Sequence, residues 1–333
     1  MSVKEAFSPI KTTCSDEKPV LDADLSLCPE KDRPRMVALI NRLAKSEQGM
    51  DALTVAVKNG YRFTFMAEDK KANGSTNFFS KRVTLNPFRS DDKLIGTLCH
   101  ECRHAGQNAR SSVLRFEDGW DIRSNLLYNR AMEADAQACA LAACKELELR
   151  GDERPYAEFK EKYPEIESAF AKAYEKDDRI TDNAMTEAFK GWYDQERIKT
   201  LYEQGYILRP LANDLEWIKK GLDGKTFDRS VSAQLTVGEI TQTKTGNYFT
   251  DDPEILNGGK YMAVAEDTME QMKNYVAARK RATGGKDDCS AILKGIPTRP
   301  TYVVPDMIQI APPIGKQALP PAMKRKIAAA KSR

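Results

Sequence analysis

The two histidines of the chain stand four residues apart, in the run His100-Glu101-Cys102-Arg103-His104. Side chains at positions i and i+4 of a helix lie one turn apart on the same face, so both imidazoles can reach one metal ion about 2 Å away. Glu101 projects beside the same place, where a carboxylate can accept a proton from an activated water molecule and pass it to a leaving amine. The spacing predicts a zinc site on a helix, with Glu101 as general base. The alternative is a pair of ordinary histidines on an amphipathic helix.

A catalytic zinc site needs a third protein ligand, and with no histidine left this ligand must be a carboxylate or a thiolate. The leading candidates are Glu133 and Asp135, in an alanine-rich predicted helix. Residues i and i+2 lie about 200° apart on a helix, so at most one of them can face the metal. Glu133 shares a polar strip with Arg130 and Gln137, whereas Asp135 lies among alanines. We therefore predict Glu133 as ligand and Asp135 as the residue that orients a zinc-bound histidine, with the reverse assignment left open.

The seven cysteines are odd in number and lie mostly in predicted helices, which favours reduced thiols over a disulfide framework. Cys99, Cys102, Cys139 and Cys144 could suggest a four-thiolate zinc site. This alternative is disfavoured, because Cys139 and Cys144 are five residues apart and point about 140° away from each other on a helix.

Hydrophobic periodicity and capping residues indicate the elements that must position these side chains. Five elements are predicted around the site: a helix from Pro34 to Gly60, strands at 61–66 and 77–85, a helix that begins at Ser90, and a helix over about 124–150. Asn73-Gly74 is predicted to form a turn between the strands. The pattern indicates an α+β domain with a small mixed or antiparallel sheet.

The chain divides into four predicted parts: a flexible arm (1–34), the α+β domain (35–150), a mainly helical lobe packed on it (151–285), and a proline-rich, basic, disordered tail (286–333). The 52 basic and 49 acidic residues leave a net charge of +3, too small to attract nucleic acid or anionic lipid. The tail has no interleaved aromatic residues, so no nucleic-acid partner is expected. No apolar run reaches the roughly 20 residues that cross a bilayer, and the N-terminus has no apolar signal core. We expect a cytoplasmic protein, with secretion by a non-classical route left open.

The His-Glu-x-x-His run with a downstream glutamate resembles the zincin metallopeptidases, in the glutamate-ligand branch called gluzincins. A closer resemblance is to an uncharacterised bacterial family of candidate metallopeptidases, through these motifs: Leu85-Asn86-Pro87, Leu94-Ile95-Gly96-Thr97-Leu98, His100-Glu101, Arg103-His104-Ala105, Gln107 and Glu133-Ala134-Asp135-Ala136. The resemblance implies zinc on His100, His104 and Glu133, with Glu101 as general base, in a zincin-like fold. One departure is Gln137, because many gluzincins carry an acidic residue four positions after the glutamate ligand.

The function implied by this resemblance is zinc-dependent hydrolysis of a peptide or protein substrate. In zincins the strand before the metal helix is an edge strand that can pair with an extended peptide, which here would be Phe78 to Leu85. Tyr128 and Arg103 are candidates for the oxyanion donor. The alternatives are a degenerate zincin fold that serves as a binding or effector scaffold, and a zinc hydrolase with a substrate other than a peptide.

Overall fold

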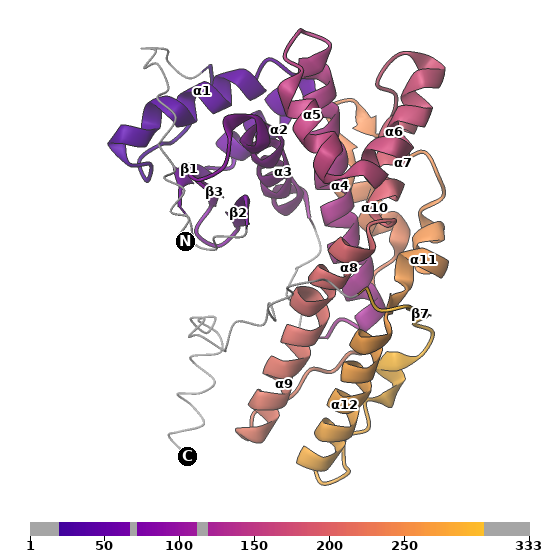
Figure 1. The fold of residues 1–333 in the computed structure, drawn as a ribbon. Coiled ribbons are helices and arrows are strands. Elements are labelled where there is room, and N and C mark those ends of the chain that lie inside the picture. The colour runs from indigo at the N-terminus through magenta and orange to yellow at the C-terminus, as the bar shows by residue number, and fades with distance from the viewer. Residues whose placement is uncertain (1–19, 67–71, 112–118, 303–333) are drawn as a thin grey trace, which may run out of the picture. The chain divides into compact units, whose positions relative to one another are not determined.

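The protein is represented by a computed structural model that describes residues 20–66, 72–111 and 119–302 (Figure 1). The chain divides into two compact units, each built from separate segments. The first unit comprises Met1–Glu196, Lys225–Ala263 and Gly295–Pro297, and the second comprises Arg197–Gly224, Val264–Lys294 and Thr298–Arg333. Most of the predicted arm (1–19) and of the predicted tail (303–333) lies outside the described residues. No helix in the described part of the chain is long and apolar enough to cross a membrane.

The first unit combines many helices with small sheets, which confirms the predicted α+β class. Its elements are η1 (Glu30–Asp32), α1 (Arg33–Leu43), α2 (Glu47–Lys58), β1 (Arg62–Phe65), β2 (Gly74–Asn77), β3 (Arg82–Leu85), α3 (Asp91–Arg110), α4 (Ile122–Glu148), α5 (Arg154–Lys162), α6 (Pro164–Asp177), α7 (Asp182–Trp192), α10 (Ala233–Ile240), β4 (Gln242–Thr243), β5 (Gly246–Asn247), η3 (Pro253–Asn257) and α11 (Gly259–Met262).

The helix predicted from Pro34 to Gly60 is in fact two helices, α1 and α2. Ser46 has an extended backbone, and its hydroxyl accepts a hydrogen bond from the backbone N–H of Gly49 at 3.0 Å. A serine that caps in this way satisfies a donor at a helix start, so it begins a new helix within the continuous apolar pattern. Gly60 follows α2 with a φ of 73°, as expected of a residue that ends a helix.

The strand predicted over 77–85 is also two elements, β2 and β3, joined by a tight turn. The side chain of Asn77 accepts a hydrogen bond from the N–H of Ser80 at 2.8 Å, and Lys81 takes a left-handed φ of 47°. These features reverse the chain within the run that was predicted to be one strand. The turn predicted at Asn73-Gly74 is wrong, because Gly74 begins β2.

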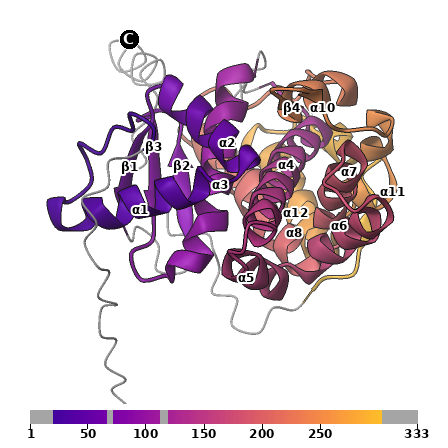
Figure 2. The same ribbon diagram turned by 90° about the horizontal axis from the view of Figure 1, so that it is seen from above.

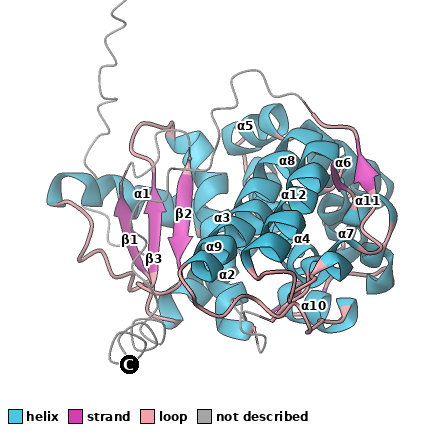
Figure 3. Ribbon diagram, turned by 90° about the horizontal axis from the view of Figure 1, so that it is seen from below, coloured by secondary structure: helices cyan, strands magenta, loops and turns pink. Residues whose placement is uncertain are grey.

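The three strands form a mixed sheet in the order β1-β3-β2 (Figure 3). β3 is parallel to β1 and antiparallel to β2, with Thr76 opposite Val83. The predicted edge strand is therefore corrected: β3 lies at the centre of the sheet, because β1 pairs with one of its edges and β2 with the other. β2 is the edge strand next to α3, which packs on it.

α3 and α4 carry all the predicted site residues. α3 begins after Ser90, whose hydroxyl accepts from the N–H of Lys93 at 3.3 Å, as predicted. α4 begins after Asp121, whose carboxylate accepts from the N–H of Ser124 at 2.6 Å. The alanines of α4 allow close approach on several sides, and it packs against α2, α3, α5, α7 and α10 (Figure 2). α4 is thus the central helix of the first unit.

The second unit contains α8 (Glu196–Glu203, from its second residue), the π-helical segment η2 (Gln204–Leu208), α9 (Arg209–Lys219), β6 (Val264–Ala265), α12 (Glu266–Ala282), η4 (Ser290–Leu293) and β7 (Thr298–Arg299). Buried ion pairs hold it together, with 2.7 Å between Arg299 and Glu203 and 3.0 Å between Arg279 and Asp214. β7 pairs in parallel with β6. Both η4 and β7 therefore form ordered elements of this unit, although they fall in the segment 286–333 that was predicted to be a disordered tail.

Candidate metal centre

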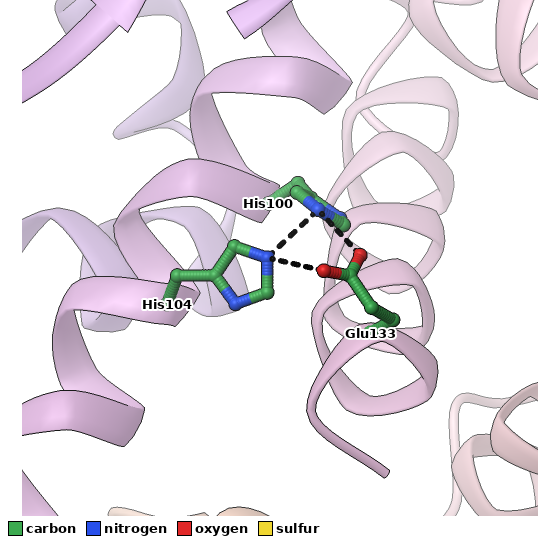
Figure 4. Close-up of side chains that lie close together, drawn as sticks. All are labelled: His100, His104 and Glu133. Carbon is green, nitrogen blue, oxygen red and sulfur yellow. Dashed lines mark hydrogen bonds and ion pairs between the residues drawn. The ribbon is translucent and has the colours of Figure 1, made fainter. Parts of the chain in front are cut away.

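Three buried side chains from α3 and α4 converge on one point (Figure 4). The Nε2 atoms of His100 and His104 are 3.0 Å apart. Each faces one oxygen of Glu133, at 3.4 Å from His100 and 3.5 Å from His104. Within the described residues this is the one group of three or more His, Cys, Asp or Glu side chains whose candidate ligand atoms all lie within 4.8 Å of one another. The structure thus brings together the three residues predicted as ligands.

The spacing of these four atoms, two imidazole nitrogens and the two oxygens of Glu133, fits a metal ion. Ligands bound about 2.0–2.1 Å from a tetrahedral metal lie about 3.3–3.4 Å from each other. The observed separations of 3.0, 3.4 and 3.5 Å bracket that value. The donor set of two imidazole nitrogens and one carboxylate is also one that holds divalent transition metals.

The ionisable side chains of this group change one another's pKa values. Burial lowers the pKa of His104, but Glu133, Glu101 and Gln107 together raise it by more, so the net pKa lies above 6.5. Burial raises the pKa of Glu133, and the two imidazoles lower it by more, so this carboxyl stays ionised well below its usual range. A negative carboxylate fixed beside two imidazole nitrogens makes the site attractive to a cation.

Glu101, the predicted base, is 7% exposed and held by the edge strand β2. The hydroxyl of Thr76 lies 2.8 Å from the Glu101 Oε2 atom and 2.8 Å from its backbone oxygen. Gly74 permits this close approach, because a Cβ there would lie 2.9 Å from the oxygen of Thr84 and 3.2 Å from Cγ of Glu101. β2 therefore fixes the direction of the Glu101 side chain.

Comparison with known proteins gives one match. The profile of the family described as "Putative metallopeptidase family (DUF6782)" matches residues 16–214, more than half of the chain. The chain belongs to this family. Neither curated proteins nor solved structures gave a match. His100, Glu101, His104 and Glu133 all fall inside the matched residues, so the candidate site lies in the part of the chain that matches the family profile.

Asp135 lies behind this group and does not join it. Its carboxylate forms a buried ion pair with Arg103, at 2.6 and 2.9 Å, and accepts a hydrogen bond from Gln107 at 2.6 Å. The hydrogen bond to the histidine comes from Gln107, whose Oε1 is 2.8 Å from Nδ1 of His104. Asp135 thus reaches His104 through Gln107, where the sequence predicted direct contact.

The two predicted oxyanion donors are engaged elsewhere. The guanidinium of Arg103 donates hydrogen bonds to the carboxylate of Asp135 and to the carbonyl of Ile240. The hydroxyl of Tyr128 lies 3.1 Å from that of Ser111, and its ring packs edge-on against Trp120.

A tyrosine that the sequence did not single out lies near the site. Tyr163, between α5 and α6, has a hydrogen bond to Gln137 of α4. Burial, with further contributions from the charges of Glu133 and Glu101, raises its pKa to about 12, so the hydroxyl keeps its proton at neutral pH. No local pattern marks this residue, because only tertiary packing brings the junction of α5 and α6 toward α4.

The cysteines around α3 and α4 are free, buried thiols. Burial raises the pKa of Cys99 and Cys102 well above the usual value and that of Cys144 to about 12. Thiols with such values are poor metal ligands and poor nucleophiles. No four-thiolate group occurs among the described residues.

Proposed function

We propose that this chain is a zinc-dependent peptidase of the zincin type. The observation that carries the proposal is the convergence of His100, His104 and Glu133 within 4.8 Å, beside Glu101, in a member of a metallopeptidase family. Structural zinc sites are closed by four protein ligands, whereas three leave a position for water or substrate. A group of three ligands with an adjacent carboxylate therefore favours catalysis over a structural metal.

Zinc, when bound, supplies a Lewis acid that activates water and polarises the scissile carbonyl. Glu101 accepts the proton of the attacking water and passes it to the leaving amine. Thr76 holds the Glu101 carboxylate in one direction, at 2.8 Å, so that the proton is transferred along a fixed path. Tyr163, protonated at neutral pH, is the proposed donor to the negative oxygen that develops on the carbonyl.

The proposed substrate is a peptide in extended conformation, bound along the outer edge of β2. Among the described strands β2 pairs only with β3, so its other edge can accept main-chain hydrogen bonds. Thr76 and Gly74 of the same strand contact Glu101, which brings this edge next to the proposed base. A peptide bound there would form an additional strand of the sheet and would lie next to Glu101.

The test is hydrolysis of a diverse peptide library by the zinc-loaded protein, read by mass spectrometry. Glu101→Gln keeps the size of the side chain and removes its ability to take a proton, so new peptide ends should appear with the parent and not with this variant. Asn108→Leu, on the same helix but hydrogen-bonded to Tyr61, is the matched control and should cleave like the parent. Zinc binding without cleavage of any peptide would reject the peptidase and favour a binding scaffold or a hydrolase of another substrate.

A further inference from the structure

A buried hydrogen-bond chain runs from α4 to one of the two imidazoles. The side-chain nitrogen of Gln107 donates to the backbone oxygen of Met132 at 2.9 Å and to Oδ2 of Asp135 at 2.6 Å. Its oxygen, Oε1, lies 2.8 Å from Nδ1 of His104. Gln107 is 1% exposed and Asp135 is fully buried, so water does not compete for these groups.

The partners decide which way the amide faces. A backbone carbonyl and a carboxylate only accept hydrogen bonds, so the NH₂ group of Gln107 must point at Met132 and Asp135. Its oxygen is then left for His104, and because this oxygen only accepts, Nδ1 of His104 must carry a proton. In the neutral ring the other nitrogen, Nε2, is then unprotonated.

We propose that Gln107 is a positioning residue that fixes His104 in its Nδ1–H tautomer, so that the lone pair of Nε2 faces His100 and Glu133 and is ready for a metal. The metal part of this inference rests on the proposed function, whereas the tautomer is a property of the metal-free chain. Orientation of a metal-binding histidine through its second nitrogen is a general requirement of such sites.

Asp135 acquires a specific role in this arrangement. Arg103 holds both of its oxygens, and the hydroxyl of Tyr248 donates to Oδ1 at 2.9 Å. Because both oxygens are already held by groups that donate to them, the carboxylate acts only as an acceptor for Gln107, which prevents the amide from turning over. Tyr248 lies beyond residue 214, where the family match ends, so the support of His104 extends into a later part of the first unit.

The imidazole of His100 has no hydrogen bond that corresponds to the one between Gln107 and His104. Nδ1 of His100 is buried and has no hydrogen-bond partner among the described residues. Because Nε2 of His104 is unprotonated and 3.0 Å from Nε2 of His100, the latter must be the donor in the neutral, metal-free pair. The two imidazoles are therefore expected to show opposite tautomers, Nδ1–H for His104 and Nε2–H for His100.

The test uses metal-free, full-length protein with ¹⁵N-labelled histidine, at a pH where both rings are neutral. With two histidines in the chain, long-range ¹H–¹⁵N spectra resolve each ring, and single His→Ala variants assign them. The parent should show one ring of each tautomer. Gln107→Leu removes the acceptor and should abolish the Nδ1–H form of His104. Asn108→Leu removes an amide from the neighbouring position and should change neither ring.

A zinc titration against a competing chelator completes the test. Gln107→Leu should bind zinc at least about tenfold more weakly than the parent. An Nε2–H ring for His104 in the parent, or an unchanged tautomer in Gln107→Leu, would overturn the proposal whatever the zinc result. A tautomer shift without weaker zinc binding would overturn its metal part. If the parent binds no zinc, the proposed function fails, and the spectra still decide whether Gln107 fixes the tautomer.

Discussion

Removal of the Asp135 carboxylate should destabilise the first unit far more than loss of an ordinary ion pair. Asp135 and Arg103 are 0% and 3% exposed, and Asp135→Ala leaves the guanidinium with the carbonyl of Ile240 as its remaining acceptor. An unpaired buried charge of this kind costs about 3–5 kcal/mol of unfolding free energy. The matched control is Asp152→Ala, which breaks an ion pair with Arg42 whose side chains are 30% and 24% exposed and should lose less than about 1 kcal/mol.

The assay is urea unfolding followed by tryptophan fluorescence in a Trp217→Phe background. The remaining tryptophans, Trp120 and Trp192, both lie in the first unit, so the signal reports on that unit. Arg103→Met combined with Asp135→Leu removes both charges, and should regain at least about half of the lost stability, because an apolar pair needs no buried partner. A loss below about 1 kcal/mol for Asp135→Ala, equal to that of Asp152→Ala, would refute the reasoning that this pair is desolvated.

Three further predictions concern the site itself. Thr76→Val keeps the side-chain volume and removes the hydrogen bond to Glu101. Because hydrogen bonds to charged groups contribute about 1.5–3 kcal/mol, kcat should fall about 10- to 100-fold with zinc content unchanged. Steady-state kinetics with a cleaved peptide measure this, and an unchanged kcat would exclude a role for β2 in holding Glu101. Tyr163→Phe should lower kcat with little change in KM, as expected for a donor that acts in the transition state, and a change in KM alone would reject that role. In the metal-free protein the pKa of His104 is raised above its unfolded value near 6.5, since Glu133, Glu101 and Gln107 together outweigh burial. The stabilisation is therefore present below pH 6.5 and is lost as the pH rises through the folded pKa, so the melting temperature should decline over that range in the metal-free parent and stay level in His104→Ala.

The convergence of the candidate site could be predicted from the sequence because its signals are local. His100 and His104 are one turn apart on one helix, and Glu133 was favoured over Asp135 because it lies on the polar strip of its helix, whereas Asp135 lies among alanines. The structure brings His100, His104 and Glu133 together, while their roles as ligands stay predictions. The α+β class followed from the same periodicities, and the metallopeptidase family from the motifs around Glu101 and Glu133.

The surroundings of the site could not be predicted, because they depend on contacts between distant segments. The partner of Asp135 was wrongly expected to be a histidine, since no spacing rule links Arg103 on α3 to Asp135 on α4. Tyr248 is 113 residues from Asp135 in the chain and touches it only in the folded structure. Tyr163 likewise comes near the site through the packing of α5 on α4.

Two local errors have a different cause. α1 and α2 continue one apolar pattern, and the predicted strand 77–85 spans the end of β2, a turn and all of β3, so the sequence pattern alone does not show either break. The breaks are set by single side chains, the hydroxyl of Ser46 and the amide of Asn77, which satisfy backbone N–H groups. Capping and turn chemistry therefore decided the positions of elements that hydrophobic patterns left undivided.

The central claim is a metal ion held by His100, His104 and Glu133, and elemental analysis of the purified protein tests it most directly. The parent, His100→Ala, Glu133→Ala and the control Glu146→Ala should be purified without chelator and then exposed to zinc. Glu146 is the matched control because it lies on the same helix and accepts a hydrogen bond from Gln48, away from the site. About one zinc per chain in the parent and in Glu146→Ala, and loss of zinc in the other two variants, is the predicted result. A parent that neither retains nor takes up a metal ion, or a Glu133→Ala variant that binds zinc as tightly as the parent, would contradict the account.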